Sequence, residues 1–304
     1  MRTAFLGTSE FAAAVLRRLA GSPHPPALVV TPPDRRQGRG RKLQPPPAAV
    51  VAAELGLDLL QSENVNEPGA LGQIRAAEPA AVLVCAFGQL IREPLLSEFP
   101  ILNVHPSLLP RWRGAAPIER AMMAGDATTG VCVMQLTAGL DSGPVAICEE
   151  VPIEPGEDFS ALSARLAELG GELLVRALDL QAEGALELTE QSEDGVTYAE
   201  KIAPAERRLD PGLPAAELAA KVRALNPHVG TYLETAAGER LGVRRACPIE
   251  TDGTDVPPGA LAARDGALLL GCGEGVLRLD VVQPPGSKAM PADAYLRGHE
   301  PPRL

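Results

Sequence analysis

The segment Thr3-Ala4-Phe5-Leu6-Gly7-Thr8-Ser9-Glu10-Phe11 opens the chain with a short apolar run, a glycine turn and the start of a helix. We predict a strand over residues 2–7 and a helix over residues 9–21, with Ser9 as its N-cap and Gly21 at its end. A strand that leads directly into a helix is the first half of a βαβ unit. The opening segment therefore predicts an α/β fold built on a mostly parallel sheet.

The same alternation of strands and helices continues through the first half of the chain. Short apolar runs bounded by turn residues predict strands, and longer stretches with helical periodicity lie between them. The predicted strands are residues 27–31, 81–86, 101–105 and 129–135, and the predicted helices are residues 47–56, 67–78, 115–124 and 160–183. This pattern predicts a Rossmann-like, doubly wound sheet with helices on both faces.

The last third of the chain has a different texture. A helix over residues 214–225 is followed by short strand-like runs, which are separated by Asp-Gly and Gly-Glu-Gly turns. These runs are residues 231–235, 240–246, 259–263, 266–271 and 275–283. We therefore predict a small OB-like β-barrel.

The change of texture also predicts the domain organisation. A polar stretch with few apolar residues separates the two halves and is typical of a linker. We predict a Rossmann-like catalytic domain over residues 1–188, a linker over residues 189–208 and a C-terminal OB-like domain over residues 209–304.

The composition is that of a soluble globular protein of 304 residues, with 45% apolar and 22% charged residues. No apolar run approaches the roughly 18–20 residues that span a bilayer. The five cysteines are odd in number and far apart, which excludes a disulfide scaffold and a zinc ribbon. We therefore expect a cytoplasmic protein with no membrane partner and no metal site.

The charge is unevenly distributed. The net charge of −11 argues against a general nucleic-acid coat protein. Residues 34–42, however, carry five positive charges and one negative charge. This basic segment is either a solvated loop or a contact for an anionic partner, and composition alone does not choose between them.

The turn at Gly7-Thr8-Ser9 stands where a doubly wound fold can bind phosphate. The fingerprint G-x-G-x-x-G is absent, because Thr8, Ser9, Glu10 and Phe11 follow Gly7. A tight turn that needs one glycine explains the segment as well. The sequence therefore gives no support to a nicotinamide oxidoreductase, and no NAD is expected.

Two further segments carry groups suited to acyl transfer. Asn103 and His105 alternate along a short strand, so both point to one face at its C-terminal end, where α/β sheets bind ligands. Asp141 lies between two glycines in Gly139-Leu140-Asp141-Ser142-Gly143. An amide can donate to an oxyanion, and an imidazole can exchange a proton near pH 7. The carboxylate can either orient the imidazole or help to remove an amine proton.

No nucleophile elbow of the form G-x-S-x-G is present, and no cysteine lies near His105 in the sequence. Covalent catalysis is therefore not favoured. The three groups together indicate direct acyl transfer.

The string Asn103-Val104-His105-Pro106-Ser107-Leu108-Leu109-Pro110-Arg111-Trp112-Arg113-Gly114, with the downstream Gly-Leu-Asp-Ser-Gly, resembles the signature of the folate-dependent formyltransferases. The resemblance spans nearly all 304 residues. It includes the opening turn, the basic loop at 33–43, the segment 197–202 and the segment 283–291. Pro106 and Pro144 depart from the common pattern, which leaves only the local loop geometry in doubt.

The resemblance implies a formyl donor, 10-formyltetrahydrofolate, and an acceptor, the α-amino group of methionyl initiator tRNA. No metal, NAD or obligate protein partner is implied. The catalytic residues would be Asn103, His105 and Asp141. The folate site would include Ser107, Leu108, Leu109 and Pro110, and the tRNA contacts would include Arg39, Arg41, Lys42 and Lys201.

The basic loop would sense the end of the tRNA and become ordered on binding, with Arg39 projecting between Gly38 and Gly40. The C-terminal barrel would hold the tRNA.

Two other functions stay open from the sequence. One is formyl transfer to a small amine, such as a purine precursor or an amino-sugar nucleotide, which would need neither the basic loop nor the β-rich last third. The other is a non-catalytic RNA-binding protein. Residues 209–304 contain ten basic and twelve acidic residues, which makes that domain alone a poor RNA binder.

Overall fold

The computed structural model describes residues 1–37, 42–249 and 256–304. The chain forms two compact units, each assembled from more than one segment. The first comprises residues 1–114, 128–152 and 163–198, and the second comprises residues 115–127, 153–162 and 199–304. No helix within the described ranges is long and apolar enough to cross a membrane.

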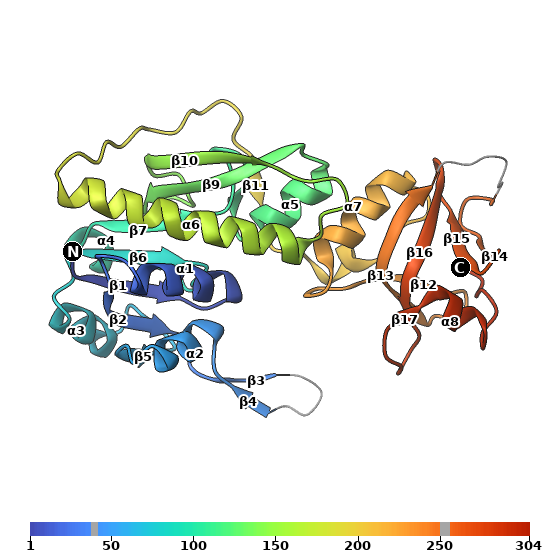
Figure 1. Ribbon diagram of the computed structural model, residues 1–304, viewed down its shortest axis with the longest axis horizontal. Helices are drawn as coiled ribbons and strands as arrows, with labels where there is room; N and C mark the ends of the chain where they lie inside the picture. Colours follow the sequence, from blue (N-terminus) through green and yellow to red (C-terminus); the bar gives the residue numbers. More distant parts are fainter. Residues whose placement is uncertain (38–41, 250–255) are drawn as a thin grey trace. The chain divides into compact units, whose positions relative to one another are not determined.

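A seven-stranded sheet forms the centre of the first unit (Figure 1). Its strand order is β10-β9-β7-β6-β1-β2-β5, and the five strands from β7 to β5 are parallel, whereas β9 and β10 are antiparallel. The strands are β1 (Thr3–Gly7), β2 (Pro26–Thr31), β5 (Leu59–Gln61), β6 (Ala81–Cys85), β7 (Ile101–His105), β9 (Thr128–Gln135) and β10 (Val145–Pro152). The predicted mostly parallel, doubly wound sheet is confirmed. The sequence analysis missed β5 and β10.

Helices cover both faces of this sheet. On one face, Ala4 and Leu6 of β1 pack in one apolar cluster with Ile74 of α3 and Leu95 of α4. On the other face, α6 approaches so closely that a Cβ on Gly170 would lie 2.8 Å from Val104. The helices are α1 (Glu10–Ala20), α2 (Pro47–Glu54), α3 (Pro68–Ala76), α4 (Leu95–Glu98) and α6 (Phe159–Ala182). Residue alternation along β1 and β7 thus sends successive side chains to opposite helix layers.

The turn between β1 and α1 brings the strand and the helix into close contact. A Cβ on Gly7 would lie 2.6 Å from the Phe5 ring and 2.8 Å from Cβ of Ala12. Ser9 caps α1 by accepting a hydrogen bond from the Ala12 amide at 3.4 Å. The need for glycine here follows from close strand–helix contact, which agrees with the tight-turn interpretation of this segment.

The described residues of the basic segment contribute to two short strands. β3 (Arg35–Gln37) pairs with β4 (Lys42–Gln44) in antiparallel register, with Arg36 opposite Leu43. The sequence analysis predicts only a loop here. Arg39 and Arg41 lie outside the described residues.

Cys132 of β9 and Cys148 of β10 form a disulfide. The two residues are directly opposite in the antiparallel ladder, although they are 16 positions apart in the chain. Cysteine spacing does not reveal this pairing, because the register of the hairpin brings the two side chains together. The exclusion of a multi-bridge scaffold is unaffected, but one cross-strand bond is present that the sequence analysis does not anticipate.

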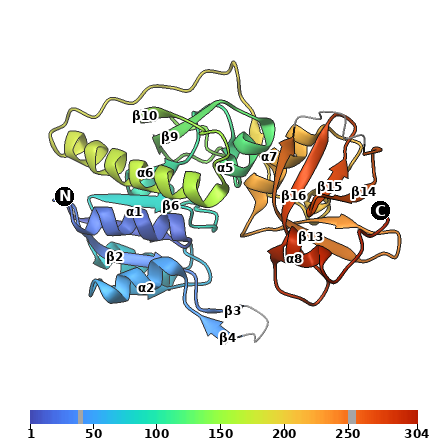
Figure 2. The same cartoon turned by 45° about the vertical axis from the view of Figure 1, so that its right-hand side comes forward.

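The second unit contains an antiparallel sheet of order β12-β13-β16-β15-β14, with β17 paired to β16. Figure 2 shows β13, β14, β15 and β16 of this sheet. This is the separate antiparallel domain that the sequence predicts. Its strands are β12 (Thr231–Glu234), β13 (Arg240–Ile249), β14 (Leu261–Arg264), β15 (Ala267–Gly271), β16 (Val276–Gln283) and β17 (Met290–Pro291).

Helix α7 closes the core of this sheet, with Leu218 and Val222 buried against residues of β13 and β16. The unit also holds α5 (Pro117–Ala124), η1 (Pro204–Arg207), α7 (Ala215–Leu225) and α8 (Ala292–Leu296). Two further short strands, β8 (Arg113–Gly114) and β11 (Tyr198–Ala199), form a two-stranded sheet of their own.

Candidate active site

Asn103 and His105 lie at the C-terminal end of β7 and are 7% and 4% exposed. Because Val104 between them faces α6, both polar side chains point to the opposite face of the sheet. β7 is also the last parallel strand before the antiparallel pair β9 and β10. The predicted pair therefore shares one face and one strand end.

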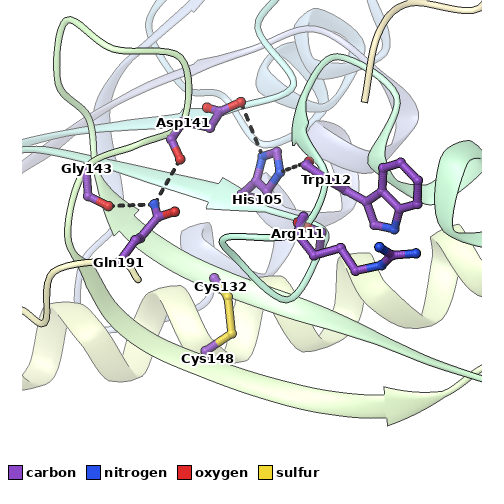
Figure 3. Close-up of a disulfide and its surroundings, with 9 residues drawn as sticks. His105, Arg111, Trp112, Cys132, Asp141, Gly143, Cys148 and Gln191 are labelled. Carbon is purple, nitrogen blue, oxygen red and sulfur yellow. Dashed lines mark hydrogen bonds and ion pairs between the residues drawn. A yellow bond between two sulfur atoms is a disulfide. The ribbon is translucent and has the colours of Figure 1, made fainter. Parts of the chain in front are cut away.

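Both nitrogens of the His105 ring have a partner (Figure 3). Nε2 lies 2.9 Å from the carbonyl oxygen of Trp112, and Nδ1 lies 3.7 Å from Oδ2 of Asp141. A carbonyl can only accept, so Nε2 carries a proton and donates it. Nδ1 is then the ring atom that is available for proton exchange, and it faces the Asp141 carboxylate.

A compact turn presents the Trp112 carbonyl to His105. Ser107 is fully buried, and its hydroxyl donates to the Arg111 carbonyl at 2.7 Å. Trp112 has a φ of 64°, and the bond between Leu109 and Pro110 is cis. The predicted folate residues Ser107, Leu108, Leu109 and Pro110 thus form the turn that leads from β7 to Trp112. In this turn the Ser107 hydroxyl donates its proton to a main-chain carbonyl.

Asp141 comes from the loop between β9 and β10 and adopts a φ of 44°. Its Oδ2 accepts a hydrogen bond from the Gly114 amide at 2.9 Å, and its side chain is 14% exposed. The flanking glycines are sterically required. A Cβ on Gly143 would lie 2.0 Å from the Gln135 carbonyl oxygen. The loop therefore folds tightly enough to bring the carboxylate beside His105.

The Asn103 side chain makes no hydrogen bond to another residue in the part of the chain that the structure describes. Asn103 is only 7% exposed, but its side-chain nitrogen and oxygen are not among the described buried polar atoms that lack a partner, so they reach solvent. The amide is therefore open to a substrate oxygen. An amide, an imidazole and a carboxylate are groups suited to acyl transfer.

Three residues around this site were not predicted as functional. Gln191 hydrogen-bonds the main chain of the Asp141 loop, Arg113 hydrogen-bonds Gln191, and Thr197 hydrogen-bonds the Trp112 amide. Thr197 begins one of the segments on which the family resemblance rests. Gln191 stands in the polar stretch assigned to a linker, and no local pattern distinguishes it there.

Lys42 of β4 and Lys201 are both exposed, Lys42 in the first unit and Lys201 in the second. Arg39 and Arg41 belong to the segment without described structure. Within the described ranges, no group of three or more His, Cys, Asp or Glu side chains is arranged to hold a metal ion.

Comparison with protein families identifies the class of this fold and site. Residues 1–178 match the formyl transferase family, and residues 201–300 match the formyl transferase C-terminal domain. The chain belongs to the formyl transferase family. It is therefore a one-carbon group transferase.

Individual relatives match over the whole length. The methionyl-tRNA formyltransferase of Stenotrophomonas maltophilia K279a is 43% identical over 307 residues, which cover 100% of this chain and 99% of that protein. The methionyl-tRNA formyltransferase of Methylobacillus flagellatus is 41% identical over 302 residues, covering 98% and 97%.

Among solved structures, HypX from Aquifex aeolicus in complex with tetrahydrofolic acid covers 100% of this chain and 49% of its own, with a TM-score of 0.67 and 18% identity. That likeness concerns the fold.

Proposed function

We propose that this chain transfers the formyl group of 10-formyltetrahydrofolate to the α-amino group of methionyl initiator tRNA. The observation that carries the proposal is the full-length identity of about 40% to methionyl-tRNA formyltransferases. The Asn103, His105 and Asp141 side chains at the end of β7 supply groups suited to that reaction. Formyl transfer to a small amine and a non-catalytic RNA-binding role are not favoured.

The proposed chemistry is a direct attack by the neutral amine. Its nitrogen bonds to the formyl carbon, and the bond from that carbon to the folate nitrogen then breaks. The Asn103 amide donates to the oxygen that becomes negative, and protonated Nδ1 of His105 is a second donor. Asp141 accepts the proton that the amine loses, and the folate nitrogen takes up this proton as it leaves, so that the step needs no further acid or base.

A pocket lined by residues of η1, β12 and β13 in the second unit supports tRNA binding. Arg207, Arg240 and Arg244 line a pocket of about 180 Å³ together with Tyr232. Burial and, to a smaller extent, the neighbouring Arg207 guanidinium lower the pKa of Arg244. The ion pairs between described residues include none of these three arginines.

Three arginines that line one pocket and have no ion pair to a described carboxylate fit an anionic ligand. A phosphate group of the tRNA backbone is the anion that the proposed substrate offers. We therefore assign this pocket to the tRNA, in addition to Arg39, Arg41, Lys42 and Lys201.

The remaining assignments follow from the same function. Residues 1–188 would form the catalytic domain, residues 189–208 the linker and residues 209–304 the tRNA-binding domain. Ser107, Leu108, Leu109 and Pro110 would border the folate. A tRNA substrate places the enzyme in the cytoplasm.

The test is formyl transfer from labelled 10-formyltetrahydrofolate to a panel of acceptors. Methionyl initiator tRNA should be formylated, whereas free methionine, an amino-sugar nucleotide and glycinamide ribonucleotide should not. The Asp141→Asn variant, assayed in parallel, controls for transfer by a contaminating enzyme. Transfer to a small amine at a comparable kcat/KM would overturn the proposed acceptor. Formylation of methionyl-tRNA that does not depend on added 10-formyltetrahydrofolate would overturn the proposed donor.

A further inference from the structure

Gln191 is the point at which the two loops that flank His105 are joined. Its Nε2 donates to the Asp141 carbonyl at 2.9 Å and to the Gly143 carbonyl at 2.7 Å (Figure 3). Its Oε1 accepts from Nε of Arg113 at 2.9 Å. Two acceptors and one donor fix the orientation of the amide, because carbonyls only accept and a guanidinium only donates. All three polar positions of this side chain face the site.

The segment that carries Gln191 is attached to the catalytic unit at both ends. Thr189 exchanges two main-chain hydrogen bonds with Val145, the first residue of β10. Thr197 accepts at its carbonyl from the Arg113 amide and at its hydroxyl from the Trp112 amide, both at 2.9 Å. Residues 189–197 therefore bridge the loop that supplies Asp141 and the turn that supplies the Trp112 carbonyl.

The geometry at Asp141 requires such support. Its φ of 44° lies in the left-handed region, which aspartate enters more readily than most residues but which still favours glycine. The Gln191 amide binds the carbonyl of that same residue. Asp141 in turn directs Oδ2 to the Gly114 amide and toward Nδ1 of His105. A loss of the Gln191 donors would release the main chain that sets the position of the carboxylate.

We propose that Gln191 is a positioning residue for formyl transfer, which acts by holding Asp141 against His105. The proposal rests on the proposed function. It also gives residues 189–197 a role in catalysis, because this stretch fixes both partners of the imidazole. Arg113, 6% exposed and anchored through its amide to Thr197, keeps Gln191 in place.

Two variants test the proposal. Gln191→Met keeps the length of the side chain and removes every hydrogen bond. Gln191→Glu keeps the acceptor for Arg113 and removes both donors to the loop. A misplacement of about 1 Å can lower a rate by up to about 100-fold. We expect both variants to lower kcat by about 10- to 100-fold, with KM for the folate and for methionyl-tRNA within about two-fold of the parent. Gln73→Met on the exposed face of α3 is the matched control and should leave kcat unchanged.

A double-mutant cycle with Asp141→Asn separates positioning from a general structural role. If Gln191 acts through Asp141, Gln191→Met should lower kcat by less than about two-fold in the Asp141→Asn background. The pH profile of kcat should also change in the same way in the single variants Gln191→Met and Asp141→Asn. Additive losses of kcat, or a Gln191→Glu variant with parental kcat, would overturn the proposal. If Gln191→Met does not fold, Gln191→Glu provides the same cycle, since its pairing with Arg113 remains.

The outcome for the parent protein keeps this test distinct from that of the proposed function. A parent chain that does not formylate methionyl-tRNA contradicts the proposed function. A parent chain that does so, with Gln191 variants of equal kcat, contradicts only the role of Gln191.

Discussion

The end of β7 in the first unit and the arginine pocket in the second unit differ in how readily their polar groups can be recognised from the sequence. Two of the groups at β7 come from one strand, Asn103 and His105, and the third comes from one glycine-flanked loop. The pocket takes Arg207 from η1 and Arg240 and Arg244 from β13. Each region thus combines two residues of one strand with a third from a separate segment, but recognisable local patterns accompany only the groups at β7.

This contrast explains what the sequence revealed about each region. Asn103 and His105 could be paired from strand alternation alone, and the glycines identified the Asp141 loop. The arginines of the pocket carry no motif, because side chains from a 3₁₀ turn and a strand meet only when the unit has folded. The composition of residues 209–304 even argued against a basic surface, since the acidic residues there are more numerous. An average over a domain hides a local concentration of charge.

The same reasoning applies to the elements of the fold. Helix α6 and five strands of the first unit (β1, β2, β6, β7 and β9) were predictable, because their apolar patterns are clear. β5 has three residues, and exposed carboxylates interrupt β10 at Glu149 and Glu150, so neither gives a clear pattern. The disulfide and the contacts of Gln191 depend on register and tertiary position. No local propensity reports them.

The largest effect should come from the catalytic strand. We expect Asn103→Ala and His105→Ala to lower kcat by ~10²–10³, because loss of one oxyanion donor typically has that cost. Thermal stabilisation by a folate analogue should persist, since the proposed role of both side chains is to stabilise the transition state. Steady-state kinetics and a thermal-shift titration measure the two effects. Asn64→Ala, in an exposed turn, is the matched control. Near-parental kcat in His105→Ala would remove the imidazole from the reaction.

A smaller effect, on binding and not on the chemical step, should come from the arginine pocket. Arg207→Ala and Arg240→Ala should raise KM for methionyl-tRNA several-fold and leave kcat at saturation unchanged. Each should also reduce the slope of log affinity against log salt by about one, as expected for one lost phosphate contact. Arg297→Ala, which removes an exposed arginine of the same unit that is paired with Asp293, is the control. A drop in kcat with an unchanged KM would contradict the proposal that the arginine pocket binds the tRNA and that the groups at β7 carry out the chemical step.

The ion pair between Arg120 and Glu206 should contribute a pH-dependent part of the stability of the second unit. The hydrogen bond from Arg120, 2.5 Å from Oε1, lowers the pKa of Glu206, and the Ala203 amide adds to this effect. A carboxyl whose pKa is lower in the folded state stabilises the fold above its unfolded pKa of about 4.3, and this stabilisation is lost as the pH falls through the folded pKa.

Glu206→Gln should therefore lower the Tm at pH 7, and its Tm should fall less steeply than that of the parent between about pH 5 and 3. Because Glu206 is about one-third exposed, solvent screening limits the effect to a few degrees at most. Glu172→Gln on α6 replaces an exposed carboxyl and is the comparison variant. A parallel decline of the Tm of Glu206→Gln and parent in acid would show that Arg120 does not hold this carboxylate.

The smallest effect should come from the disulfide, although Cys132 lies opposite His105 in the ladder between β9 and β7. The hairpin of β9 and β10 is paired over most of its length, so the strands keep their register without a covalent bond. In the cytoplasm, the location proposed for this protein, most thiols are kept reduced, and Cys132 and Cys148 would be present there as thiols. We expect kcat in a thiol reductant to stay within about two-fold of its value without reductant.

Alkylation and mass spectrometry of the unfolded, unreduced protein should label Cys85, Cys247 and Cys272 and leave the bonded pair unlabelled. A several-fold fall of kcat on reduction would mean that the position of His105 depends on the cross-strand bond, in addition to the tertiary contacts of residues 189–197.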